Sequence, residues 1–142
     1  MLAKVQSDEI GVQGWGGRSF TYWLSLLFSI GLIALGVNGL VQPEAASRAF
    51  GLGIVASQDS GMVMAKALRD LVLGLTIGLF VWLKMKKTLM LLACVSAVIP
   101  IGDGILVLTQ YGGETQDSWQ HFITAFLVLM AAFLLWYERK RA

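Results

Sequence analysis

The chain has 142 residues, enough for one domain, but 56% of them are hydrophobic and only 14% are charged, against about 25% charged in a typical soluble domain. The formal net charge of +2, without a basic groove that carries interleaved aromatic side chains, argues against a nucleic-acid partner. The single cysteine, Cys94, cannot form a disulfide within the chain. This composition predicts an integral membrane protein in contact with the lipid bilayer.

Four apolar stretches are long enough to cross about 30 Å of hydrocarbon as helices. In chain order they are about 20–41, 61–83, 88–108 and 118–137. The first has 22 residues, whereas the apolar core of a signal peptide has about 7–15. Strands are not expected, because the runs do not alternate and lipid excludes an open sheet edge. We therefore predict an all-α, antiparallel four-helix bundle of four spans over 20–137, after an N-terminal arm (1–19) and before a basic tail (138–142).

The connecting segments carry local signals of their own. The run Pro43 to Phe50, followed by Gly51, is typical of a short helix, because Pro suits the first turn and Gly the position past the last. We expect this helix at the membrane interface, and Trp15 of the Gly-rich arm at the headgroup level. Pro100 has no N–H to donate to the Ser96 carbonyl, so it is expected to kink the third span.

The distribution of basic residues predicts the orientation of the chain. Eight of the eleven Lys and Arg residues lie in the N-terminal arm, in the 84–87 turn and in the C-terminal tail. Because positive residues favour the cytoplasmic side, we expect both termini in the cytoplasm. The 42–60 and 110–117 loops then face the lumenal or extracellular side.

Antiparallel threading gathers most polar residues of the spans into one half of the bilayer, towards that same side. They are Asn38, Glu44, Lys66, Arg69, Asp70, Asp103, His121 and Thr124. An ionised side chain at the bilayer centre costs about 2.5–3.5 kcal/mol on insertion scales, and such residues usually mark a functional site. Convergence of several of them in one leaflet therefore predicts a polar site inside the bundle.

Each ionisable residue also has a purely structural interpretation. Lys66 can extend to the interface, and Arg69 with Asp70 can form an ion pair that locks two helices. Asp103, flanked by glycines, can mark a turn that ends its helix, and His121 can form a hydrogen bond at the headgroup level. A metal site is not expected, because one His and one Cys with scattered carboxylates do not supply a ligand set.

Gly74 and Gly78 continue the stripe of Lys66 and Asp70 at four-residue spacing. This small-xxx-small pattern lets another helix approach closely. The partner is either a helix of the same bundle or a second copy of the chain, in which case a homo-oligomer forms through these glycines.

Several short motifs resemble those of a family of small four-span membrane proteins from bacteria and fungi, called domain of unknown function 4267. The resemblance covers about residues 25–135. It is carried by Gly36-Val-Asn-Gly39, Pro43-Glu44, Arg48-Ala-Phe-Gly51, Lys66-x-x-Arg69-Asp70, Ile99-Pro-x-Gly-Asp103 and His121-x-x-Thr124-Ala125. It implies the four-span fold and brings no established activity. Fungal relatives that lie among biosynthetic genes for lipophilic natural products favour an enzyme.

The leading functional hypothesis is a membrane-embedded enzyme that acts on a small lipophilic molecule by acid–base chemistry without a cofactor. One carboxylate would act as general base and the other as general acid, with an arginine between them. The expected catalytic residues are Asp70, Asp103, Arg69 and His121, and the expected substrate-binding residues are Asn38, Glu44, Lys66 and Thr124. Epoxide hydrolysis, cyclisation to an ether and double-bond isomerisation suit this set. The alternative is a non-catalytic membrane scaffold, subunit or transporter component, in which the same charges hold helices together.

Overall fold

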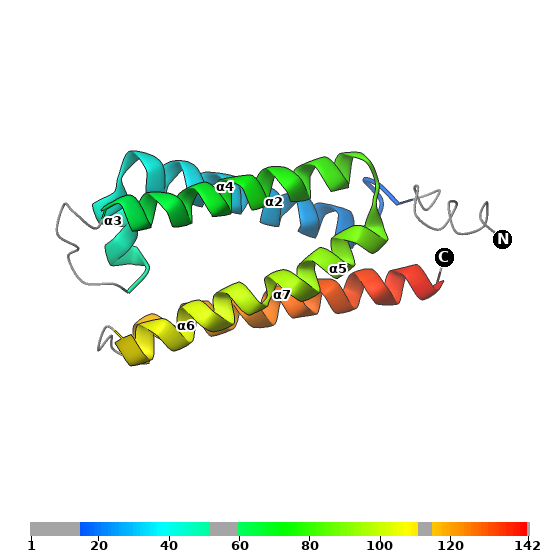
Figure 1. Cartoon of the computed structure of the whole chain (residues 1–142). Helices are drawn as coiled ribbons and strands as arrows, with labels where there is room; N and C mark the ends of the chain where they lie inside the picture. The colour runs from blue at the N-terminus through cyan, green and yellow to red at the C-terminus, as the bar shows by residue number, and fades with distance from the viewer. Residues whose placement is uncertain (1–14, 52–59, 111–114, 142) are drawn as a thin grey trace.

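The computed structural model describes residues 15–51, 60–110 and 115–141, and within these ranges all regular structure is helical (Figure 1). The helices are α2 (Phe20–Val41), α3 (Pro43–Ala49), α4 (Ser60–Trp82), α5 (Lys86–Ser96), α6 (Val98–Gln110) and α7 (Thr115–Arg141). The prediction of an all-α bundle is confirmed. Residues 1–14 of the predicted arm and Ala142 of the predicted tail lie outside the described residues.

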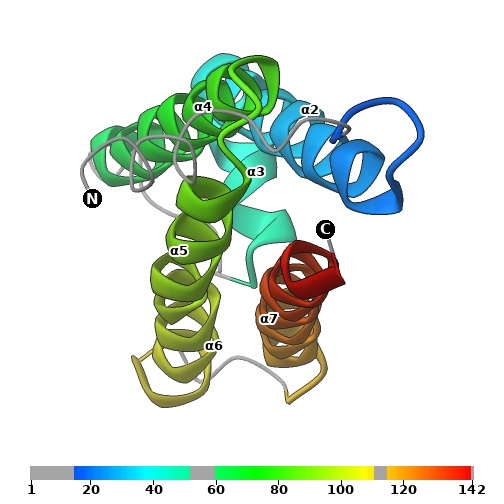
Figure 2. The same ribbon diagram turned by 90° about the vertical axis from the view of Figure 1, so that its right-hand side faces the viewer.

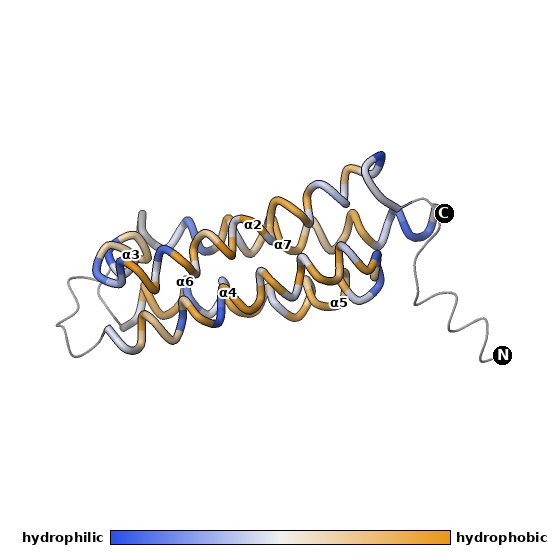
Figure 3. The backbone as a smooth tube through the Cα atoms, turned by 90° about the horizontal axis from the view of Figure 1, so that it is seen from above, coloured by the Kyte–Doolittle hydropathy of each residue, from blue (hydrophilic) through white to orange (hydrophobic). Residues whose placement is uncertain are grey.

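Three helical segments are long and apolar enough to cross a membrane: Phe20–Val41, Lys86–Thr109 and Ser118–Lys140. Hydrophobic residues follow the middle of the helices and hydrophilic residues gather towards the ends (Figure 3), as expected of an integral membrane protein. Helix α4 has the length of a span, with 23 residues. Its charged residues Lys66, Arg69 and Asp70 set it apart from the three apolar segments in composition.

The bundle consists of two helical hairpins, which we call the α2/α4 hairpin and the α5–α7 hairpin. In the first, α2 packs along α4, and in the second, α5 and α6 pack along α7 (Figures 1 and 2). Small residues make the α2/α4 contact close. A Cβ placed on Gly36 of α2 would lie 2.6 Å from the Leu71 Cβ and 2.7 Å from the Ala67 carbonyl oxygen of α4. The α2/α4 hairpin is therefore a tightly packed unit.

The glycine stripe of α4 is used inside this hairpin. A Cβ on Gly74 would lie 2.8 Å from the Ile33 nitrogen, and one on Gly78 would lie 2.8 Å from Ser29 Oγ. Ser29 Oγ also donates a hydrogen bond of 2.8 Å to the Gly74 carbonyl. The close approach predicted for these glycines therefore occurs within one chain, and buried Gly74 does not offer a surface to a second copy.

Two helix boundaries follow their local signals. The third apolar stretch is divided at Ala97 into α5 and α6, because Pro100 cannot supply the N–H that would bond the Ser96 carbonyl. The next backbone bond, from the Ile101 N–H to the Ala97 carbonyl, is long at 3.4 Å. The span that was expected to kink at Pro100 is thus divided about one turn before it, at Ala97.

Helix α3 confirms the short helix expected between the first two spans. It starts at Pro43, and Gly51 after its end has a φ of 87°, a conformation that glycine adopts without steric cost. The helix descends from the α2/α4 hairpin towards α7 (Figures 1 and 2). It thereby lies between the two hairpins at one end of the bundle, and its position at a membrane interface stays a prediction.

The opposite end of the bundle is held by a polar network that we call the termini-end cluster: Trp15, Ser19, Thr21, Lys86 and Glu138. Glu138 Oε2 accepts hydrogen bonds from Thr21 Oγ1 at 2.6 Å and Ser19 Oγ at 2.8 Å, and Lys86 Nζ lies 3.1 Å from it. Trp15 Nε1 donates to Thr21 Oγ1 at 2.9 Å. This network joins α2, α5 and α7.

The termini-end cluster adds detail to two expectations. Trp15 is only 3% exposed, because its indole N–H bonds Thr21 and its ring packs against Tyr22, and its position at the headgroup level stays a prediction. From residue 138 onward the chain continues α7 as a helix to Arg141, and Glu138 belongs to the packed end of the bundle.

Candidate functional site

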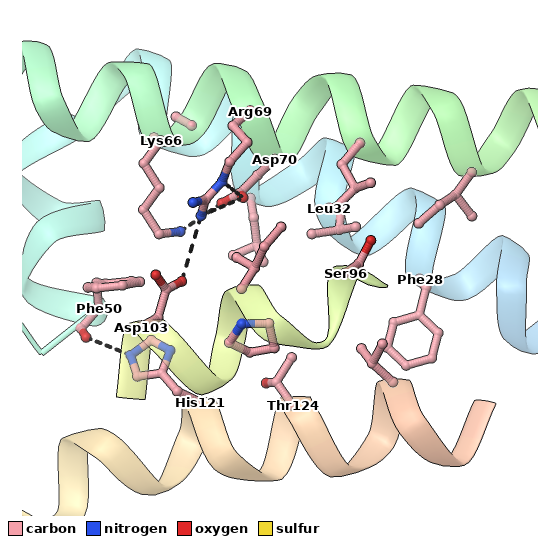
Figure 4. A pocket seen from close by; sticks show the side chains of 18 of the residues that line it. Phe28, Leu32, Phe50, Lys66, Arg69, Asp70, Ser96, Asp103, His121 and Thr124 are labelled. Atoms are coloured by element: carbon pink, nitrogen blue, oxygen red, sulfur yellow. Dashed lines mark hydrogen bonds and ion pairs between the residues drawn. The ribbon is translucent and has the colours of Figure 1, made fainter. Parts of the chain in front are cut away.

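A cavity of about 550 Å³ lies between the α2/α4 hairpin and the α5–α7 hairpin (Figure 4). Pockets of roughly 300–1,000 Å³ hold drug-sized molecules in other proteins. Apolar side chains form most of its wall, and its polar residues concentrate near α3. At this polar end of the cavity, four charged side chains and one histidine lie close together.

Asp70 is the most enclosed of these charges, with 6% of the residue exposed. Lys66 Nζ lies 2.7 Å from its Oδ2, and Arg69 Nη2 lies 3.3 Å from its Oδ1. Lys66 and Asp70 are neighbours because residues four apart share one face of a helix. Both oxygens of Asp70 are therefore engaged by cations of its own helix.

Asp103 has different surroundings. It projects from α6 on the opposite hairpin, and its side chain is 16% exposed. Its Oδ2 lies 3.6 Å from Arg69 Nη2, and within the described ranges this is its one polar contact. Arg69 thus stands between two carboxylates, one on its own helix and one across the cavity, as the dashed lines of Figure 4 show. The structure brings together the Asp–Arg–Asp arrangement expected from the sequence.

His121 enters the site from α7 and is 9% exposed. Its Nε2 lies 3.0 Å from the carbonyl oxygen of Phe50. Because a carbonyl can only accept, Nε2 carries the proton of this bond, and Nδ1 is the nitrogen that can accept a hydrogen bond in the neutral ring. In Figure 4 the second ring nitrogen points away from Phe50.

Phe50 is a site residue that we did not predict as one. Its ring lies 4.4 Å from the His121 ring, centroid to centroid, and Lys66 Nζ lies 4.5 Å from its centroid. The latter is a cation–π contact. Phe50 therefore links a cation of α4 to the histidine of α7. In the sequence, Phe50 stands out only by its place before Gly51 in a motif. No neighbouring residue indicates that α3 inserts between the hairpins.

Of the remaining predicted residues, two line the cavity and one lies outside it. Asn38 and Thr124 line the cavity, and Thr124 Oγ1 donates to the Gln120 carbonyl of its own helix at 2.7 Å. Glu44, expected to bind substrate, is exposed in the first turn of α3 and does not line the cavity. A carboxylate there suits the positive end of the helix dipole, which accounts for its presence. Ser96 is a polar cavity residue that the prediction missed.

Metal binding has no evident basis among the described side chains, where no three His, Cys, Asp or Glu residues come together. The charges that are present fit acid–base chemistry, hydrogen bonding or helix locking.

The family model of domain of unknown function 4267 (DUF4267) matches residues 29–135. The chain belongs to this family. The five residues Lys66, Arg69, Asp70, Asp103 and His121 all lie inside the matched part of this DUF4267 chain, whereas Trp15, Ser19, Thr21 and Glu138 of the termini-end cluster lie outside it. No curated protein and no solved structure matched in the corresponding searches.

Proposed function

We propose that this DUF4267 protein is a membrane-embedded enzyme that opens an epoxide or shifts a double bond in a lipophilic molecule, with Asp103 as the carboxylate that transfers the proton. The observation that carries the proposal is the unequal setting of two carboxylates in one apolar cavity. Asp70 is held by two cations on α4, whereas Asp103 has one contact of 3.6 Å and an oxygen outside that contact.

The proposal includes four membrane spans with both termini in the cytoplasm. Helix α4 runs antiparallel to α2 and has 23 residues against 22, so it can cross the same thickness. Its charges are compensated by one another and by Asp103, which lowers the cost of their burial. Positive residues at the termini end favour the cytoplasm, and the site then lies towards the lumenal or extracellular side.

In epoxide opening, the oxygen of water or of an internal hydroxyl forms a new bond to one ring carbon while the ring C–O bond breaks. The Asp103 carboxylate takes the proton of the attacking oxygen and then delivers it to the ring oxygen, so that the carboxylate is regenerated and the net change is the addition of O–H across one C–O bond. Arg69 and Lys66 stabilise the negative charge that develops on the ring oxygen. His121 Nδ1 and Asn38 orient the substrate by hydrogen bonds.

Isomerisation uses the same carboxylate. Asp103 removes a proton from one carbon and returns it to another, while the cations stabilise the enolate-like charge of the intermediate. Neither reaction needs a redox partner, and water is consumed only in epoxide hydrolysis.

A non-catalytic scaffold is the second candidate function. One observation favours it: in the described part of the chain, no buried side-chain nitrogen or oxygen lacks a hydrogen-bond partner. In that case the contact of Arg69 with Asp103 would serve to hold the hairpins together, and the cavity would be filled by lipid.

The test is turnover of a panel of lipophilic epoxides by the full chain in phosphatidylcholine nanodiscs, with ¹⁸O-water incorporation into the diol read by mass spectrometry. Asp103→Asn should lower turnover about 100- to 10,000-fold, the usual contribution of general acid–base catalysis. Its melting temperature should stay close to that of the wild type, since the lost contact is long.

Glu138→Gln is the matched control, because it makes the same carboxylate-to-amide change on the same hairpin outside the cavity. It should keep wild-type turnover per folded molecule. Unchanged turnover in Asp103→Asn would contradict the role of Asp103. Absence of ¹⁸O incorporation by the wild type across the panel would contradict epoxide hydrolysis.

A further inference from the structure

We infer that the cavity takes one elongated, uncharged lipophile, with an oxygen function at the Asp103 end and a hydrocarbon tail that runs along α7 towards Leu135. The ligand class rests on the proposed function, since it takes the cavity to be the substrate site. Three features of the described residues carry it: the length of the cavity, the change from polar to apolar along it, and its charge balance.

The length follows from α7. Besides Gln120, the cavity residues of this helix are His121, Thr124, Val128, Ala131 and Leu135, which recur every three or four residues and so share one face. His121 and Leu135 are fourteen residues apart, which is about 21 Å at 1.5 Å per residue. That is about twice the diameter of a sphere with the volume of the cavity, so the space is elongated along the helix.

The chemistry of the wall changes along this length. Near α3 it presents the charged residues and His121. The far part is mostly apolar, with side chains such as Phe28, Leu92, Val128 and Leu135, and its polar groups are the uncharged hydroxyls of Ser25 and Ser96. Leu89 and Leu135 also belong to a buried apolar cluster with Trp15 and Val81, which closes the far end against the termini-end cluster. A ligand that fits both parts has a single polar end and a hydrocarbon tail.

The charge balance selects an uncharged polar end. Two cations, Lys66 and Arg69, face two carboxylates, Asp70 and Asp103, and every one of these four groups has an opposite charge within 3.6 Å. A carboxylate or phosphate headgroup would bring a third anion without a further cation to match it. An ammonium group would likewise have no free anion. Burying an unmatched charge is costly, whereas a hydroxyl, carbonyl or epoxide oxygen brings no net charge into the cavity.

Access for such a ligand lies between the hairpins. Several apolar residues that line the cavity are also widely exposed, among them Leu35 at 61%, Met62 at 78% and Leu106 at 49%. In the proposed four-span arrangement these side chains face lipid, so a lipophile enters from the bilayer without crossing an aqueous phase. The binding site is then continuous with the acyl chains that carry its ligand.

The test measures binding, not turnover, with the full chain in phosphatidylcholine nanodiscs. The probes are 1,2-epoxyhexadecane, hexadecanol, palmitate and hexadecylamine, which share one tail length and differ at the head. The two uncharged probes should bind at least about tenfold more tightly than either charged probe. Tighter binding of palmitate or of the amine would overturn the inference, and so would equal binding of all four.

Position is tested by a diazirine on the last carbon of hexadecanol, which should cross-link to the 128–135 segment of α7. Val128→Trp, which fills the middle of the cavity, should abolish binding of hexadecanol but not of octanol. Phe126→Trp on the outer face of α7, where Phe126 is 66% exposed, is the matched control and should bind both. Cross-links confined to outward-facing residues would overturn the inference, even where Val128→Trp fails to fold.

The result separates the ligand class from catalysis. Binding of the uncharged probes without turnover of any epoxide would support the ligand class and contradict the proposed epoxide opening. Turnover accompanied by preferred binding of palmitate would support the enzyme and contradict the uncharged ligand.

Discussion

The two ends of the bundle use similar side chains in opposite ways. At the termini-end cluster, Lys86 is 4% exposed on its side chain and lies 3.1 Å from Glu138, which also accepts bonds of 2.6 and 2.8 Å from hydroxyl groups. At the other end, Arg69 is 42% exposed and lies 3.6 Å from Asp103, beside a cavity of about 550 Å³. The comparison indicates that one set of charges fastens the helices, whereas the other borders a cavity.

The two carboxylates of the cavity should contribute unequally to the stability of the protein. Asp70→Asn leaves Lys66 and Arg69 without their nearest carboxylate, and removing one partner of a buried pair typically costs about 3–5 kcal/mol. Because both cations are partly exposed, we expect a loss of about 3 kcal/mol in the free energy of unfolding. Asp103→Asn should lose less than about 1 kcal/mol. Unfolding by sodium dodecyl sulphate, followed by circular dichroism, measures both, and equal losses would remove the distinction between the two carboxylates.

A second prediction concerns the ion pair of Lys86 and Glu138 in the termini-end cluster, which should stabilise the bundle. Glu138→Gln keeps an oxygen for Ser19 and Thr21 but leaves Lys86 without its anion. We expect a loss of about 2 kcal/mol in the free energy of unfolding. The double variant Glu138→Gln, Lys86→Met should recover part of it, because the unpaired buried cation is gone. A single variant as stable as the wild type would show that this end is not held by the ion pair.

The smallest expected effect concerns Phe50. Phe50→Leu removes the ring beneath Lys66 but keeps the backbone carbonyl that His121 contacts, so it should cost about 0.5–1 kcal/mol, the worth of an exposed cation–π contact. Phe126→Leu, at an exposed position of α7, is the control in the same unfolding measurement. Equal losses of unfolding free energy in the two variants would indicate that the change in apolar surface, not the cation–π contact, causes the loss.

The parts of the fold that depend on neighbouring residues could be predicted from the sequence. The bounds of α2, the start of α3 at Pro43 and the interruption before Pro100 all follow from apolar length or from proline geometry. The cavity charges were also evident, because ionisable residues inside an apolar run are costly and therefore conspicuous.

The features that were missed depend on contacts between distant segments. Trp15 looks like an interfacial residue until the chain folds it against Thr21, and Glu138 looks like part of a solvated tail until Lys86 approaches from α5. Phe50 joins the site only because α3 inserts between the hairpins, and the same insertion leaves Glu44 outside it. Residues at helix ends have several common environments, so local pattern alone does not distinguish them.

Proton transfer by Asp103 in the proposed reaction can be tested by chemical rescue. Asp103→Ala removes the carboxylate and leaves space for a small acid, so added formate should restore epoxide turnover in proportion to its concentration. We expect such a rise in Asp103→Ala and none in Glu138→Ala, whose turnover per folded molecule does not depend on the missing carboxylate. A folded Asp103→Ala variant that turns over as fast as the wild type without formate would show that Asp103 does not transfer the proton.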